Sequence, residues 1–145
     1  MWREENGSAS LEFVSVGMLL LVPLVYLILV ASSLQGASLA AEGAARQGAR
    51  LFAQAPDEAT GQARLHRAVV LGLDDFGFTE DDGRVEVRCA PQPTSCLRRG
   101  GTVTVEIRIA VSLPFVPRVI RSVGVGMIPV VASATSPVSR LWVGE

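Results

Sequence analysis

An apolar run near the amino terminus constrains this chain more than any other feature. From Phe13 to Ala31 every residue is apolar or small, and the interruptions are Ser15, Gly17, Pro23 and Tyr26. A helix needs about 20 such residues, at ~1.5 Å rise each, to cross a ~30 Å hydrocarbon core. Proline is tolerated in a membrane helix. We therefore expect a retained transmembrane helix over residues 8–33.

A cleaved secretory signal peptide is the alternative interpretation of this run. Such peptides have an apolar region of only ~7–15 residues, which follows basic charge. Here the run is longer, and the preceding segment MWREEN carries one Arg and two Glu. The retained helix is therefore the better match.

The helical period continues beyond the apolar run, over residues 34–55. Residues four apart share a helix face, and one such column contains only small residues, namely Gly36, Ala40, Ala44 and Gly48. A neighbouring column is all alanine, and a third is polar, with Glu42 placed to pair with Arg46. We expect one unbroken helix from about Ala9 to Ala55, which Pro56 ends.

The small-residue column has two interpretations. It can reflect only the high helix propensity of alanine. It can also serve close packing of helices, as small residues at this spacing do in membrane proteins. Each glycine in a helix interior costs about 1 kcal/mol, so Gly36, Gly43 and Gly48 favour close packing.

A second, shorter helix is expected over residues 57–73, with Asp57 and Glu58 as its capped, acidic start. The residues expected to share one of its faces are Leu65, Ala68, Val69 and Gly72. His66 lies on another face and is expected to be a solvated surface residue. The acidic connection over residues 74–83 lacks the spacing of an EF-hand, so we expect a solvated loop there and not a calcium site.

From Arg84 the hydrophobic period changes to two, which indicates half-buried strands. Apolar and polar residues alternate in RVEVRC and TVTVEIRIAVSL, and Pro114 ends the second run. A third, less regular strand is expected in MIPVVASATSPV, where Pro129 and Pro137 favour an edge position. The predicted fold class is α+β: a long helix, a short helix and an antiparallel sheet of about three strands, covered by one or both helices.

Two cysteines, Cys89 and Cys96, bracket APQPTS between the first two predicted strands. A metal pair would need two further ligands, and His66, the only histidine, is far away in sequence. The remaining interpretations are a disulfide that closes a hairpin loop and two buried free thiols. The disulfide is favoured, and it indicates an oxidising, exported location for residues 56–145.

Composition and motifs give no support for chemistry or nucleic-acid binding. The net charge is −1, and the 13 basic residues are all arginine. No Gly-rich phosphate loop, zinc quartet, HExxH or GxSxG is present in the sequence. We expect no cofactor, no metal, no small-molecule substrate, no nucleic acid and no enzymatic activity. An anchored enzyme whose site the sequence does not reveal is the weaker alternative.

The residues before the apolar run resemble a type IV prepilin signal. Gly7 is followed by the small Ser8, and Glu12 is the fifth residue after that glycine. In that family a membrane aspartyl peptidase cuts after the glycine and leaves the apolar segment as the start of the mature protein. The resemblance implies a leader over residues 1–7, cleavage between Gly7 and Ser8, and a mature chain that begins at Ser8.

Within that class, GSASLEF followed by an Ala/Gly-rich helix, a short helix and a small β region is similar to the TadE-like pseudopilins of bacterial tight-adherence (Flp) pilus assembly. The resemblance implies a non-enzymatic protein of the cytoplasmic membrane, single-pass, with residues 56–145 outside. Its implied partners are the membrane, prepilin peptidase, other pilins or pseudopilins and assembly platform proteins. It implies that the chain can pack into, or prime, a pilus.

Glu12 is the residue to which this interpretation assigns a role in assembly. An α-amine at Ser8 of a neighbouring subunit would be a positive partner for its carboxylate and would set the register between subunits. The alternative for the whole chain is an unprocessed bitopic membrane protein with a small extracytoplasmic binding domain, in which Glu12 is only an acid at a helix start.

Overall fold

One long helix, α1 (Ser8–Ala53), begins the part of the chain that the computed structural model describes, residues 8–116 and 126–143. It contains 46 residues and continues through Pro23 without a break. It ends just before Pro56, which disfavours the helical conformation in the residue before it. The Ala55 N–H donates to the Phe52 carbonyl at 3.0 Å, in a tighter last turn. The predicted unbroken helix is confirmed, and its end lies two residues earlier than expected.

The second helix, α2 (Glu58–Asp74), begins at the predicted cap. Asp57 Oδ1 accepts a hydrogen bond from the Thr60 N–H at 2.8 Å, which satisfies one of the N–H groups that a helix start leaves unpaired. The buried residues of α2 are four apart, and they are Gly61, Leu65, Val69 and Leu73. The predicted face is therefore correct only in part, because Ala68 and Gly72 are half-buried.

Three antiparallel strands form one sheet in the order β1-β2-β3. The strands are β1 (Gly83–Ala90), β2 (Thr102–Ser112) and β3 (Met127–Pro137), and a short 3-10 helix, η1 (Glu80–Asp82), precedes β1. The first two strands form the predicted hairpin, in which Val87 lies opposite Val105. β3 pairs with the other side of β2 and is an edge strand, as its prolines predict.

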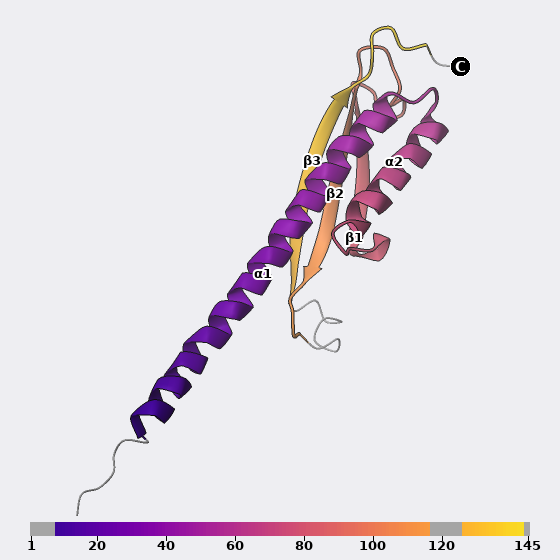
Figure 1. The fold of residues 1–145 in the computed structure, drawn as a ribbon. Helices are drawn as coiled ribbons and strands as arrows, with labels where there is room; N and C mark the ends of the chain where they lie inside the picture. Colours follow the sequence, from indigo (N-terminus) through magenta and orange to yellow (C-terminus); the bar gives the residue numbers. More distant parts are fainter. Residues whose placement is uncertain (1–7, 117–125, 144–145) are drawn as a thin grey trace, which may run out of the picture.

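The core lies between one face of the sheet and the second half of α1. The inward side chains of β2 are at most 2% exposed, and they are Val103, Val105, Ile107, Ile109 and Val111. Burial of each such side chain stabilises a fold by about 1.5–3 kcal/mol. α1 contacts β2 and β3, and α2 lies beside α1 (Figure 1). The described chain is α+β, as predicted.

α1 has two halves with different surroundings. Residues 34–53, the buried half, pack with α2 and the sheet into a folded unit that we call the head. Residues 10–29, the exposed half, extend away from the head (Figure 1), and every one of them is exposed. The change occurs within a single unbroken helix, so the orientation of the head relative to the exposed half is set by α1 itself.

Candidate functional site

From Phe13 onward the exposed half is apolar around its circumference, apart from Ser15. Its large apolar side chains are exposed at consecutive positions, from 80% at Phe13 to 36% at Tyr26. Soluble proteins rarely expose contiguous apolar patches larger than a few hundred Å². By length and composition, this is the one helix among the described residues that could cross a membrane, and its apolar stretch reaches a mean hydropathy of 2.7 with none of it buried.

Hydroxyl groups at both ends of this segment bond to the backbone of α1. Ser15 Oγ donates to the Leu11 carbonyl at 2.7 Å, and Ser33 Oγ donates to the Leu29 carbonyl at 2.9 Å. An unpaired hydroxyl is costly in hydrocarbon, and these bonds remove that cost without another element. The segment therefore needs no protein partner to satisfy these two groups.

Glu12 is the one charged residue between positions 10 and 29 of the sequence. It lies on the exposed half, about one helical turn after Ser8, where α1 begins. Within the described ranges it takes part in no ion pair. Gly7, the residue of the predicted cleavage, lies outside the described residues. The carboxylate is thus presented on the helix surface, where a group from outside the described chain can reach it.

Of the column Gly36, Ala40, Ala44 and Gly48, Ala44 and Gly48 lie against α2, whereas Gly36 lies beside Phe76, which follows α2. Ala40 and Ala44 are at most 2% exposed. A Cβ at Gly48 would collide with the Leu65 side chain, and a Cβ at Gly72 would lie only 3.1 Å from the Ala44 Cβ. The small residues therefore let α1 and α2 of the same chain approach closely, and much of the column is covered within the head.

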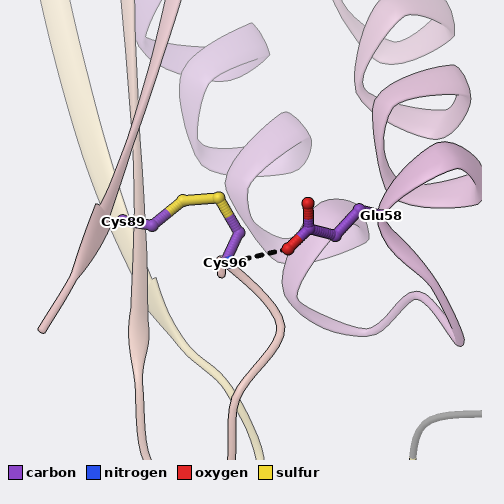
Figure 2. The surroundings of a disulfide bond; sticks show 3 residues. All are labelled: Glu58, Cys89 and Cys96. Carbon is purple, nitrogen blue, oxygen red and sulfur yellow. Dashed lines mark hydrogen bonds between the residues drawn. A yellow bond between two sulfur atoms is a disulfide. The ribbon is translucent and has the colours of Figure 1, made fainter. Parts of the chain in front are cut away.

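Cys89 and Cys96 form a disulfide that closes the loop between β1 and β2, as predicted. Figure 2 shows a second tie at the same place: the Cys96 N–H donates to Glu58 Oε1 at 2.7 Å. Glu58 is the first residue of α2, so this bond connects the loop to the helix. The bridge lies at the end of the head that is farther from the exposed half, because α2 starts where α1 ends (Figure 1).

The outward face of the sheet carries a network of ion pairs that the sequence pattern did not predict. Glu86 and Glu106 lie directly opposite each other on β1 and β2, an arrangement of like charges that is unfavourable alone. Arg88 Nε lies 2.9 Å from Glu86 Oε1, and Arg108 Nη2 lies 2.6 Å from Glu106 Oε1. The hydrogen bond from Arg88 lowers the pKa of Glu86 and raises the pKa of Arg88 itself.

His66 is a surface residue, as predicted, with its side chain 63% exposed. Its Nε2 lies 2.9 Å from Glu80 Oε1 and connects α2 to η1. The pair lines an open groove of about 420 Å³ between α2 and β1, together with apolar side chains such as Leu65 and Val85. Within residues 8–116 and 126–143, His, Cys, Asp and Glu side chains form no group of three or more that could hold a metal ion.

Phe115, which lies outside α1, is beside the exposed half, and the sequence did not single it out. Phe115 follows the end of β2, is 83% exposed, and has its ring centroid 6.4 Å from that of Tyr26. The available signal was a phenylalanine between Pro114 and Pro117, where the strand alternation stops. The signal is weak, because it does not indicate which part of α1 the residue meets.

The chain matches no family model, no curated protein and no solved structure. The functional argument therefore depends on the residues themselves. They combine an unpartnered apolar helix, a carboxylate near its start and a disulfide-bridged head, with no cluster of metal ligands in the described ranges.

Proposed function

We propose that this chain is a TadE-like pseudopilin, a non-enzymatic, membrane-anchored component of a tight-adherence (Flp) type IV pilus assembly or a related secretion system. One observation carries the proposal. A single helix begins at Ser8, presents Glu12 one turn later, remains exposed through an apolar half and then continues without a break into a folded head. An assembly of the pilin kind needs a helical segment of this type. Such a segment can lie in a bilayer and can also pack against the exposed half of α1 in other subunits.

Glu12 supplies the specificity of this packing. A charged group at the centre of a membrane helix costs about 2.5–3.5 kcal/mol on insertion scales, and less near the end of the helix. A positive partner in a neighbouring subunit offsets that cost only at one relative position of the two helices. The α-amine of Ser8, once the leader is removed, is such a partner. Glu12 would thereby fix the register between subunits.

The head is the part that the assembly would present outside the cytoplasmic membrane. Its disulfide supports an oxidising location. The charges on the outward face of the sheet are largely paired with one another, which suits a solvated surface. Its role in this proposal is to set contacts with other pilins or with assembly platform proteins, and not to perform chemistry.

Processing provides the first test. The mature protein from its native host should begin at Ser8, as determined by N-terminal sequencing and intact mass. Gly7→Val should leave the leader attached, whereas Gly17→Val, which places the same side chain in open space on the exposed half, should be processed normally. A wild-type chain that retains residues 1–7 would contradict the proposal and favour the unprocessed bitopic protein.

Assembly provides the second test. Glu12→Val should leave membrane insertion intact but remove the chain from the assembled fraction, measured by co-purification with sheared pili or with the other pilins. Glu42→Val is the matched control, because Glu42 pairs with Arg46 on the surface of the head and outside the exposed half. If Glu12→Val assembles as well as Glu42→Val, the role assigned to Glu12 is wrong.

A further inference from the structure

One end of the β2–β3 ladder lies close to the exposed half of α1. Ser112 and Met127 are the last pair of the β2–β3 ladder, and they lie at the end of the head that is nearer to the exposed half (Figure 1). Phe115 continues from there and lies against Tyr26, with ring centroids 6.4 Å apart and ring planes inclined by 38°. The head therefore meets the exposed half through the continuous helix and also through Phe115.

The space between Phe115 and α1 is an open groove with an apolar lining. Its volume is about 560 Å³, and the residues of α1 that line it are Leu21, Val22, Pro23, Val25, Tyr26 and Leu29. Phe115 is 83% exposed, so its ring contributes little to the core of the head. An aromatic side chain held this far outside the core contacts whatever surrounds the exposed half.

The position of Tyr26 along α1 indicates how deep Phe115 would lie in a bilayer that α1 spans. At ~1.5 Å rise per residue, Tyr26 lies about 27 Å along the helix from Ser8, close to the ~30 Å thickness of a hydrocarbon core. Ser32 and Ser33 follow one to two turns later and begin the polar part of the helix. The apolar run ends at Ala31, five residues or about 8 Å beyond Tyr26. Tyr26 and Phe115 therefore lie in the outer part of the bilayer, next to the interface where aromatic side chains are enriched.

We propose that Phe115 is a second membrane contact of this protein, inserted into the outer part of the bilayer beside Tyr26. The head is then held at the membrane at two places, through α1 and at its β2–β3 end. The proposal requires that α1 spans a bilayer, but it does not require pilus assembly, so it can hold if the proposed function fails.

Tryptophan fluorescence in nanodiscs tests the contact on the full chain. Trp2→Phe gives a parent in which Trp142 is the remaining tryptophan, at the end of the head far from the exposed half, where its Nε1 donates to the Ala55 carbonyl at 2.8 Å. Phe115→Trp is added to this parent and measured with brominated phospholipid. We expect a blue-shifted new component that loses most of its emission to the bromines.

Two control variants define the limits of this measurement. Leu71→Trp, on the exposed surface of α2 in the head, should show water-like emission without quenching. Leu20→Trp, in the middle of the exposed half, should be quenched if α1 spans the bilayer at all. If Phe115→Trp shows water-like emission as Leu71→Trp does, while Leu20→Trp is quenched, the proposed contact of Phe115 is wrong. The result would still be consistent with a membrane-spanning α1.

A second copy of the chain is the competing occupant of the groove. With one chain per nanodisc, the proposal predicts the same quenching of Phe115→Trp as with several chains. A blue shift that appears only when several chains share a nanodisc, without quenching by lipid bromines, would assign the groove to a neighbouring subunit and overturn the bilayer contact. Because Phe115 is so exposed, its replacement should leave the thermal transition of the head unchanged, which the same samples report through Trp142.

Discussion

The two halves of α1 form one helix but have opposite compositions and opposite surroundings. The buried half, residues 34–53, contains mostly alanine, glycine and polar residues, and Ala37, Ala41 and Ala45 are completely buried. The exposed half, residues 10–29, contains leucine, valine and phenylalanine, and none of it is buried. Most large apolar side chains of α1 are thus outside, and the buried side chains are small, apart from Phe52, which is 1% exposed.

This inversion indicates what each half is built to contact. Small side chains contribute little hydrophobic free energy individually, but they let α1 approach α2 and the sheet closely, and many dispersion contacts then add up. Large side chains exposed to water have no compensation, so the exposed half requires lipid or another apolar helix. The four predictions below change one half, or the elements that cover it, and they run from the largest expected effect to the smallest.

A single carboxylate should have different consequences in the two halves. Ala45→Asp places an unpaired charge in the core, where Ala45 is 0% exposed, and should cost the head about 4 kcal/mol or more. Leu20→Asp should reduce membrane insertion by about 2.5–3.5 kcal/mol and leave the head folded. Head unfolding is followed by Trp142 fluorescence in detergent, and insertion by alkaline extraction. A head that melts equally early in both variants would contradict the separation of the two halves.

Loss of the disulfide should weaken the head alone. Cys89 and Cys96 are separated by 7 positions, and closing a loop of this size stabilises by roughly 2–3 kcal/mol in the chain-entropy model. The double variant Cys89→Ala/Cys96→Ala should lower the urea midpoint of the head and leave membrane extraction unchanged. Reductant should shift the wild type to the same midpoint and have no effect on the double variant. A wild-type midpoint that ignores reductant would show that the bridge contributes no stability.

Two glycines of the buried half should respond in opposite directions to the same methyl group. Gly48→Ala places a Cβ against the Leu65 side chain, which is 3% exposed and would have to shift toward the groove that it lines, so we expect a loss of about 1–2 kcal/mol. Gly43 has open space around it, so Gly43→Ala should gain up to ~1 kcal/mol from helix propensity. Chemical unfolding of the full chain in detergent measures both. Shifts of the same sign would remove close packing as the reason for the small-residue column.

Local spacing in the sequence was sufficient to predict the helices and strands of this fold, but not η1, which lies in the segment expected to be a loop. The period of four, the period of two and the prolines located both helices, the hairpin and the edge strand. The buried face of α2 was only partly correct because a helix packed along an i, i+4 row buries Gly61 and Leu73, and the choice of that row depends on the surface of α1. Glu12 and the cysteine pair were found because their signals are local.

Contacts between distant segments could not be predicted in the same way. Tyr26 and Phe115 meet because β2 has a particular length and places its end beside the middle of α1. Glu86 and Glu106 become neighbours only through the register of β1 on β2. A shift of one residue in that register would move both carboxylates to other partners. The alternation in a single sequence predicts which face of a strand a residue lies on, but it does not predict which residues of two strands are paired.

The cap of α2 should provide the smallest and most specific effect. The backbone N–H and the hydroxyl of Thr60 donate to the Asp57 carboxylate at 2.8 and 2.7 Å, and these bonds hold the pKa of Asp57 below its ordinary value of 3.8. The unfolded chain therefore binds a proton at higher pH than the folded chain. The stability that Asp57 contributes is present above pH 3.8 and is lost as the pH falls through the folded pKa.

Asp57→Asn keeps a capping side chain but removes this titration, so the Tm of the head should fall less steeply on acidification than in the wild type. Thr60→Val removes the hydroxyl donor and retains the N–H, and its slope should lie between the other two. Because α2 covers only the buried half, acidification should loosen the head without releasing the exposed half from the membrane. Equal slopes in all three proteins would mean that the cap is not what couples the head to pH, and the contact of α2 with α1 would then have to be maintained by packing alone.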